Sequence, residues 1–332
     1  MSTIYLTEIG SVVRISSRHI VVTKGTERIL QMPLLKVDRL LLFGNIQITA
    51  PAMGLLLDEG VEVCYLSSNG KYRGRIQAAE SKNVLLRVAQ YERYLDDDFQ
   101  AELARTLVEG KINNGRALIL RYQRNYPDTD FSSELQVIQT ALKNLPSQKT
   151  VSSIMGSEGT STAAYFSAFG KMFRKEFRFD KRTRRPPKDP VNAILSFGYT
   201  LLTNEIFSMV SAHGLDPYVG YLHGLSYGRP SLALDAVEEF RHPFIDRFTL
   251  SLFNNEVFTA DDFRPVENKG IYLTKPALKT YFEHYERRVR EPFKLPNTDE
   301  EVNFRQLFKQ QVHKLSSTIL KKEPYEPFRI YY

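Results

Sequence analysis

Three short segments of the sequence carry side chains that could bind a cation or move a proton. Glu158 lies between two glycines, and His223 lies in a short segment that begins and ends with glycine. Asp235 and Glu238 follow, three positions apart, a spacing that places two residues on the same face of a helix. Carboxylates and imidazoles serve proteins as general acids and bases and as metal ligands. These four residues are therefore the candidate site.

The first two segments also have ordinary structural explanations. We expect a turn at the glycines around Glu158 and a helix from about Ser161, so this glutamate could simply favour a helix start. His223 could be a packed histidine that is satisfied by backbone carbonyls. His213 also precedes a glycine and is a rival candidate.

Asp235 and Glu238 lie on a predicted helix that begins at Ser231, a residue type that caps helices. Both could be solvated acids. Close to the apolar residues of this helix, however, the two carboxylates repel each other unless a positive charge lies between them. A divalent cation would remove that repulsion. A mixed oxygen and nitrogen ligand set suits Mg²⁺ or Mn²⁺ better than structural zinc, and such an ion can activate a hydroxyl and neutralise charge on a phosphodiester.

Positive charge is concentrated in residues 171–188, which contain nine basic and two acidic residues, whereas the rest of the chain has 36 of each. Four phenylalanines within residues 166–177 recur at helical spacing, and cations fall on another stripe. We therefore predict one helix with an aromatic face and a cationic face, ended by Pro186. The cationic face would bind a nucleic-acid backbone; a solvated face without a partner is the alternative. The candidate DNA-binding residues are Lys171, Arg174, Lys175, Arg178, Arg182, Arg184 and Arg185.

The elements that position these residues divide into two classes. Short runs rich in β-branched residues fill the first 80 residues, and Asn69-Gly70 is typical of a hairpin turn. Apolar residues then recur at helical spacing, with further helices expected over 190–210, 275–290 and 300–322. We predict an α+β chain: an N-terminal β-strand-rich domain, residues 1–80, followed by a larger, mostly α-helical catalytic and DNA-binding domain, residues 81–332.

Composition limits the cellular setting. The chain has 332 residues, and its single cysteine, Cys64, excludes an internal disulfide and suits a reducing compartment. We find no signal peptide and no stretch of about 18 uninterrupted apolar residues. We therefore expect a cytoplasmic protein that does not bind a membrane.

Four sequence blocks, in this order and at this spacing, resemble one known family, the CRISPR-associated adaptation integrases, the first of the two core spacer-acquisition proteins. The resemblance runs over nearly the whole chain. The blocks are Gly156-Ser157-Glu158-Gly159 with Tyr165-Phe166, then residues 184–199 (Arg-Arg-Pro-Pro-Lys-Asp-Pro-Val-Asn-Ala-Ile-Leu-Ser-Phe-Gly-Tyr), then Gly220-Tyr221-Leu222-His223, and finally residues 231–235 with Glu238-Glu239-Phe240-Arg241.

The resemblance implies a metal-dependent DNA endonuclease and integrase, with Mg²⁺ or Mn²⁺ bound by Glu158, His223 and Glu238 and with Asp235 as a supporting acid. Some members carry Asp at the position of Glu238, which offers the same hard oxygen. Tyr165 belongs to the first block, and Asn192 and Tyr199 could support the site from the helix that begins at Pro190.

The resemblance also implies a reaction and an assembly. The 3′-hydroxyl ends of a captured double-stranded DNA spacer would attack phosphodiesters at the edges of a CRISPR repeat. The protein would form a homodimer through its N-terminal domain, and a small second core adaptation protein would bridge two dimers. A general DNA-repair nuclease and a non-catalytic DNA-binding scaffold are the alternatives.

Overall fold

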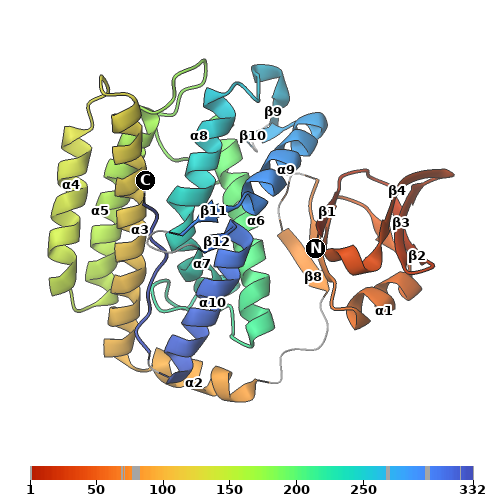
Figure 1. The fold of residues 1–332 in the computed structure, drawn as a ribbon, viewed down its shortest axis with the longest axis horizontal. Coiled ribbons are helices and arrows are strands. Elements are labelled where there is room, and N and C mark those ends of the chain that lie inside the picture. The colour runs from red at the N-terminus through yellow and green to blue at the C-terminus, as the bar shows by residue number, and fades with distance from the viewer. Residues whose placement is uncertain are drawn as a thin grey trace. The chain divides into compact units, whose positions relative to one another are not determined.

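The computed structural model describes residues 2–68, 70, 72–76, 83–266, 270–295, 300–321 and 323–331. The chain forms two compact units. The first contains residues 1–80 and 273–286, and the second contains residues 81–272 and 287–332. Residues 273–286, assigned from the sequence to the C-terminal domain, thus belong to the N-terminal unit. The predicted α+β class, a strand-rich region followed by a mostly helical one, is confirmed (Figure 1).

Two four-stranded sheets form most of the first unit. One has the order β1-β5-β7-β8 and the other the order β4-β3-β2-β6. The predicted strands beside Asn69 pair antiparallel as β7 and β8, while Asn69 itself lies outside the described residues. The elements are β1 (Ser2–Leu6), β2 (Val12–Ser16), β3 (His19–Lys24), β4 (Glu27–Pro33), the 3₁₀ turn Leu34–Lys36, β5 (Val37–Phe43), β6 (Gln47–Ile48), α1 (Ala50–Asp58), β7 (Glu62–Leu66) and β8 (Tyr72–Ile76).

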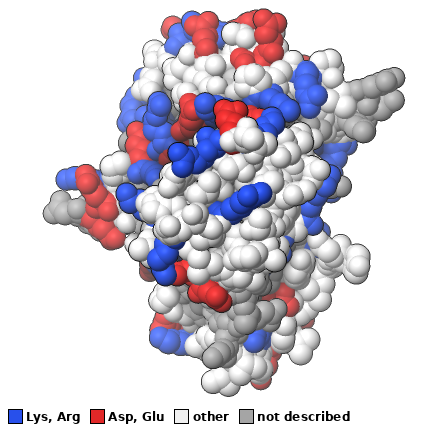
Figure 2. Space-filling view, turned by 90° about the vertical axis from the view of Figure 1, so that its right-hand side faces the viewer, with Lys and Arg blue, Asp and Glu red and all other residues white. Residues whose placement is uncertain are grey.

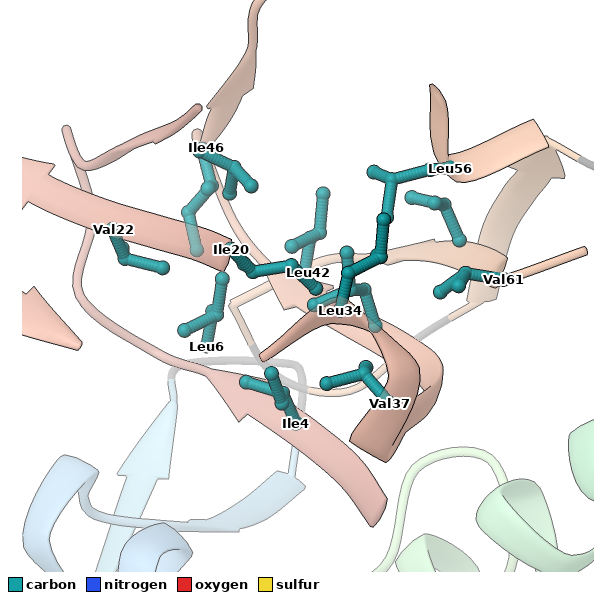
Figure 3. Close-up of a cluster of buried hydrophobic side chains, with 13 residues drawn as sticks. Ile4, Leu6, Ile20, Val22, Leu34, Val37, Leu42, Ile46, Leu56 and Val61 are labelled. Atoms are coloured by element: carbon teal, nitrogen blue, oxygen red, sulfur yellow. The ribbon is translucent and has the colours of Figure 1, made fainter. Parts of the chain in front are cut away.

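The core of this unit consists of aliphatic side chains from both sheets and from α1, as Figure 3 shows. Ile20, Val22 and Leu42 are fully buried, together with Leu56 of α1. Burying each such side chain stabilises the fold by roughly 1.5–3 kcal/mol. The apolar faces of the strands, which come from alternating side chains, therefore hold the two sheets together.

The discontinuous segment of the first unit adds an aromatic cluster. It lies on α9 (Lys275–Arg290). The Phe282 ring lies 4.2 Å from the Tyr5 ring and 4.9 Å from the Phe43 ring, measured between centroids. The Tyr5 hydroxyl donates a hydrogen bond of 2.7 Å to Glu286. The first strands therefore depend on residues from far along the sequence.

The second unit is mostly helical. Asp189 caps its central helix α6, with its side chain accepting from the Asn192 amide, and Pro190 occupies the first turn, as the sequence predicted. The helices are α2 (Val84–Tyr94), α3 (Asp97–Asn125), α4 (Ser132–Asn144), α5 (Val151–Gly170), α6 (Pro190–His213), α7 (Ser231–Val237), the 3₁₀ turn Glu238–Phe240, the π-turn Arg241–Asp246, α8 (Arg247–Asn254) and α10 (Phe304–Lys321). Short strand pairs β9–β10 (Phe263–Val266, Gly270–Leu273) and β11–β12 (Phe293–Lys294, Glu301–Val302), the 3₁₀ turns Leu145–Ser147 and Ala260–Asp262, and α9 complete the chain.

By length and mean hydropathy alone, α6 could cross a membrane. More than half of its most apolar window, 56%, is buried inside the protein. Ile194, Leu195 and Leu202 are fully buried. This is the pattern of a core helix.

Candidate active site

Glu158 lies in the middle of α5, so the predicted turn around it is wrong. Thr150 caps this helix, with its side chain accepting from the Ser153 amide at 3.2 Å. A Cβ added at Gly156 or Gly159 would meet nothing within 4 Å. The glycines therefore keep one side of the helix bare beside the carboxylate, rather than bending the chain.

His223 and Asp235 form a tightly bonded pair. The Asp235 carboxylate on α7 accepts the backbone amides of residues 221, 222 and 223 at 2.6, 3.0 and 2.9 Å, and lies 2.7 Å from His223 Nδ1. A Cβ on Gly220 would lie 2.7 Å from this carboxylate, so only glycine allows the close approach. Burial lowers the pKa of His223, but the hydrogen bond and charge of Asp235 outweigh it and raise the pKa overall.

The bond between Nδ1 and Asp235 fixes the orientation of the imidazole and leaves its Nε2 facing Glu238, whose carboxylate is 3.9 Å away. The His223 side chain therefore lies between Asp235 and Glu238. The rival His213 lies at the end of α6 and bonds the Met209 carbonyl at 2.9 Å. Ser231 does not cap α7; its hydroxyl instead donates to the Gly224 carbonyl at 3.0 Å.

Glu238 begins the 3₁₀ turn after α7, and its side chain is 3% exposed. Its carboxylate lies 2.9 Å from Arg241 Nε and 2.7 Å from Lys111 Nζ. Burial alone would raise the pKa of Glu238, but the charges of Arg241 and Lys111 hold it well below its usual range. The side chain is therefore a buried carboxylate anion.

Lys111 of α3 joins Glu158 to Glu238. It is 6% exposed and contacts both carboxylates, and Glu158 also accepts the Thr162 hydroxyl at 2.9 Å. Burial favours the neutral acid at Glu158, but Lys111 outweighs it and lowers the pKa. Sequence reasoning missed this lysine. The available signal was one cation among the apolar residues Leu107, Val108 and Ile112.

The donor set fits a hard divalent cation. Glu158 and Glu238 both contact the buried ammonium of Lys111. The His223 Nε2 atom faces Glu238, and its Nδ1 atom is held by Asp235, an arrangement found in many metal sites. Within the described part of the chain, no three His, Cys, Asp or Glu side chains are arranged to hold an ion. The Lys111 ammonium contacts both Glu158 and Glu238 and so occupies the position of their shared counter-charge. Binding of an ion there would require this ammonium to move.

Two of the three predicted supporting residues lie behind this cluster. The Tyr199 hydroxyl donates to Asp246, which accepts His242 Nδ1 at 2.7 Å, and the Tyr165 ring packs 3.8 Å from the His242 ring. Arg241 lies 4.7 Å above the Tyr199 ring, so this network positions a cation that contacts Glu238.

Asn192 does not join them. Its side chain accepts from Arg182 and from the Thr183 amide at 2.7 and 2.9 Å and donates to the Lys181 carbonyl at 2.8 Å. It therefore anchors the basic segment rather than the carboxylates.

The predicted basic helix is wrong, because α5 ends at Gly170 and residues 171–189 are irregular. A Cβ on Gly170 would lie 2.5 Å from the Phe179 carbonyl, so the chain folds back on itself there. The aromatic stripe still packs internally: Phe179 contacts Phe169 and Phe173, while Phe177 contacts Phe253 of α8.

Several of the predicted DNA-binding cations have structural partners. Lys171 pairs with Glu134 at 2.7 Å and Lys175 with Glu256 at 2.9 Å. Arg174 lies 3.9 Å above the Tyr126 ring. Arg178 donates to the Phe177 carbonyl, Arg182 to Asn192, and Arg184 and Arg185 are exposed.

A hollow of about 750 Å³ connects this basic segment with α5. Its lining includes Lys171, Lys181, Arg182 and Arg184 on one side, and Gly159 and Thr162 beside Glu158 on the other. The basic segment and the surface of α5 next to Glu158 thus line one surface depression.

Comparison with known proteins identifies the family of this chain. A sequence model of the family described as "CRISPR associated protein Cas1" matches residues 4–287. A CRISPR-associated endonuclease Cas1 from Thermus thermophilus is 36% identical over 327 residues, 98% of this chain and 94% of that protein. A second, from Rhodospirillum rubrum, is 32% identical, with 90% of each chain covered.

Solved structures share the fold. A Cas1 protein from Thermotoga maritima superposes with a TM-score of 0.83 at 26% identity, with 97% of each chain covered. A casposase bound to its integration product gives a TM-score of 0.85 at 24% identity, covering 97% of this chain and 92% of that one. From the family match and these relatives, we conclude that the chain belongs to the Cas1 family of CRISPR-associated proteins.

Proposed function

We propose that this protein is a divalent-metal-dependent DNA endonuclease and integrase of CRISPR adaptation, which joins the 3′-hydroxyl ends of captured DNA to the edges of a repeat. The observation that carries the proposal is the convergence of Glu158 and Glu238 on one buried positive charge, with His223 beside them. Carboxylates this buried require a cation, and phosphodiester chemistry requires one at the same place.

Glu158, His223 and Glu238 would hold Mg²⁺ or Mn²⁺, with Asp235 as the fourth catalytic residue. When bound, the ion supplies a Lewis acid that stabilises negative charge on the phosphate and favours an ionised hydroxyl. Asp235 keeps a proton on His223 Nδ1, so that the Nε2 lone pair stays directed into the site. Arg241 balances part of the charge of Glu238.

DNA would reach the site through the hollow beside α5. Its cationic lining supplies contacts to phosphates, while the bare helix surface at Gly159 admits the backbone close to Glu158. Contacts of this kind position a strand without reading its bases. The exposed Arg184 and Arg185 would extend the same surface.

The functional unit would be an assembly in the cytoplasm. We propose a homodimer formed through the N-terminal unit, with two dimers bridged by the small second adaptation protein on double-stranded DNA. Two solved structures of the same fold support this proposal. One is a Cas6-RT-Cas1–Cas2 complex, in which this chain matches 36% of a larger chain, and the other is a casposase bound to an integration product.

The decisive experiment is strand transfer of a short duplex with free 3′-hydroxyls into a supercoiled plasmid that carries a CRISPR repeat, with the small partner and Mn²⁺ or Mg²⁺. Wild type is compared with Glu158→Ala, His223→Ala and Glu238→Ala. The matched control is Glu239→Gln, because this adjacent buried carboxylate accepts its hydrogen bonds from Gln311, Tyr325 and the Phe328 amide, and not from the candidate site.

We expect metal-dependent joining at repeat edges by wild type and the control, and none by the three alanine variants. DNA binding without any reaction by the wild type would favour a non-catalytic scaffold. Cleavage without joining, repeat preference or need for the partner would favour a general repair nuclease.

A further inference from the structure

Two adjoining hollows flank the C-terminal segment of the chain. They measure about 400 and about 280 Å³. Both are lined by Arg121 of α3 and by Ile330 and Tyr331, so they form one strip that the C-terminal segment crosses. None of the four predicted catalytic residues lines either hollow. The strip is therefore a feature separate from the candidate active site.

Cationic side chains dominate the lining of the strip. Glu291 is the one acidic residue among the described residues that line either hollow, and it pairs with Arg288 at 2.7 Å. By contrast, on the face drawn in Figure 2, Lys and Arg residues lie among Asp and Glu residues, and most of the surface is uncharged. Arg116, Arg121, Arg124 and Arg329 line the first hollow, and Arg121, Arg247, Arg288 and Lys294 line the second.

The wall between the hollows is fixed in place. Asn114 of α3 is fully buried and donates to the Phe328 carbonyl, while its side-chain oxygen accepts from the Ile330 amide, both at 2.8 Å. The Arg329 side chain donates to Glu109 at 2.9 Å. Figure 1 shows this last segment, in dark blue, running beside α3. The strip is thus preorganised, which lowers the entropy lost on binding.

The strip lies on the side of α3 that faces away from the carboxylates. At about 100° per residue, Arg116, Leu120 and Arg124 point roughly 140–220° away from the buried Lys111. The helix rises about 12 Å between the first and last of them, so these side chains are spread widely enough to contact more than one phosphate of a strand.

We propose that this strip binds the phosphate backbone of DNA outside the reacting ends, as a second contact surface beyond the basic segment at residues 171–188. Six of its seven cations are arginines, whose planar guanidinium groups bind phosphate oxygens in a bidentate manner. A docking surface for an acidic protein would bind through apolar or aromatic anchors at its centre. The first hollow does have Leu120, Ile330 and Tyr331 in its lining, but four arginines, Arg116, Arg121, Arg124 and Arg329, line it with them, and arginine favours phosphate oxygens.

The test is DNA affinity as a function of salt, measured by fluorescence anisotropy on the full chain with a labelled duplex and with a single-stranded oligonucleotide. The variant is the triple substitution Arg116→Gln, Arg121→Gln, Arg124→Gln. A triple Arg→Lys variant keeps the charge. The matched control removes three exposed cations elsewhere in the same unit: Lys143→Gln, Lys149→Gln and Lys309→Gln.

We expect the arginine-to-glutamine variant to bind at least about tenfold more weakly, with a log–log salt slope reduced by roughly 2 to 3, because each phosphate that the protein no longer neutralises lowers the slope by about 0.9 on duplex DNA. The lysine variant keeps the slope, and the matched control changes both quantities much less. Equal weakening in the variant and the control, or no change in either, overturns the proposal. Unchanged DNA binding combined with failure to bind the small partner also overturns it and identifies a protein-docking surface.

Two measures keep the test independent of folding and of catalysis. DNA binding is measured in the presence of a chelator, so no joining reaction contributes to the result. A failure of the integrase proposal would appear in the strand-transfer experiment and not in this binding assay. In the wild type, phenylglyoxal modification of Arg116 and Arg124 is followed by peptide mass spectrometry with and without DNA. Protection by DNA supports the proposal even if the triple variant fails to fold, and equal modification with and without DNA contradicts it.

Discussion

Glu238 and Glu239 are adjacent in the sequence and both are buried, but they lie in opposite electrostatic surroundings. Glu238 contacts Arg241 and Lys111, which hold its pKa well below the usual range despite burial. The hydrogen bonds of Glu239 come instead from the Tyr325 hydroxyl, Gln311 and the Phe328 amide. There, burial outweighs the hydrogen bonds and raises the pKa from 4.5 to about 7.

The difference shows that burial alone does not decide the charge of a carboxylate in this protein. A cation within contact distance keeps Glu238 ionised, whereas neutral donors only partly offset the cost of burying Glu239. The two residues also face different tasks: one belongs to the candidate metal site, and the other fastens the C-terminal segment behind it. The following predictions are ordered from the largest expected effect to the smallest.

The substitution Glu238→Gln should have the largest effect. It leaves Arg241 without its buried counter-charge and Lys111 with Glu158 alone, which costs about 3–5 kcal/mol of unfolding free energy. It also removes a metal ligand, so joining should fall by on the order of 10³-fold, comparable to the loss of a principal electrostatic group in other enzymes. Initial joining rates and denaturant unfolding measure both effects. If the variant kept a tenth of the wild-type joining rate, Glu238 would not be a metal ligand of the site.

The substitution Lys111→Met should destabilise the metal-free protein by about 3 kcal/mol, because Glu158 loses its cation and Glu238 keeps only Arg241. Added Mn²⁺ should restore much of that stability, so that the increase in Tm on adding the ion is larger in the variant than in the wild type. Differential scanning calorimetry with and without Mn²⁺ measures this. Equal increases in both proteins would show that Lys111 and the ion do not compete.

The two glutamates should give stability profiles of opposite slope with pH. The folded protein holds a proton on Glu239 up to about pH 7, whereas the unfolded chain loses it near 4.5, so this group stabilises the fold less as pH rises through that interval, by up to about 3 kcal/mol. For Glu238, with a lowered pKa, stability is instead lost as pH falls below about 4.5.

Urea unfolding of Glu239→Gln across this pH range isolates the first effect. The decline between about pH 4.5 and 7 should flatten in the variant, because glutamine does not titrate. The amide also replaces an acceptor facing donors, at a cost of about 1–3 kcal/mol. Joining activity should persist. A decline of the same size in wild type and variant would assign it to another group.

The substitution Tyr325→Phe should have the smallest effect. It removes the hydrogen bond of 2.6 Å to Glu239 and the longer one of 3.3 Å accepted from Gln311, and it costs about 1 kcal/mol. Because the first of these bonds lowers the pKa of Glu239, its removal should move the pH-dependent decline to higher pH. Thermal unfolding at several pH values measures the shift. A midpoint that stays fixed would mean that Tyr325 does not influence the ionisation of Glu239.

The sequence predicted these regions unequally. Local patterns identified the strand-rich first region, the cap and first turn of α6, and the loop that carries His223. Residue types and spacing also singled out Glu158, Asp235 and Glu238, and the family resemblance implied their roles as metal ligands and supporting acid. Lys111 and the contacts of Glu239 escaped, because they join residues separated by 47 to 127 positions. Helical periodicity describes which side of a helix is apolar, but it does not show which distant charge will face that side.

The errors have local physical causes. Glycine beside Glu158 suggested a turn, but a helix tolerates glycine when neighbouring turns continue the hydrogen bonding, at about 1 kcal/mol each. Phenylalanine spacing through Phe177 suggested a longer helix. The same aromatic side chains pack equally well on an irregular chain that reverses at Gly170, because Phe179 and Phe253 supply the partners.

The aromatic contact of Phe282 with Tyr5 and Phe43 has a consequence during protein synthesis. The strands that carry Tyr5 and Phe43 leave the ribosome well before residue 282. At elongation rates of about 5–20 residues per second, the delay is roughly 10 to 50 s. The nascent N-terminal unit must wait through that interval with these two rings uncovered, while the whole of the second unit up to residue 272 is translated.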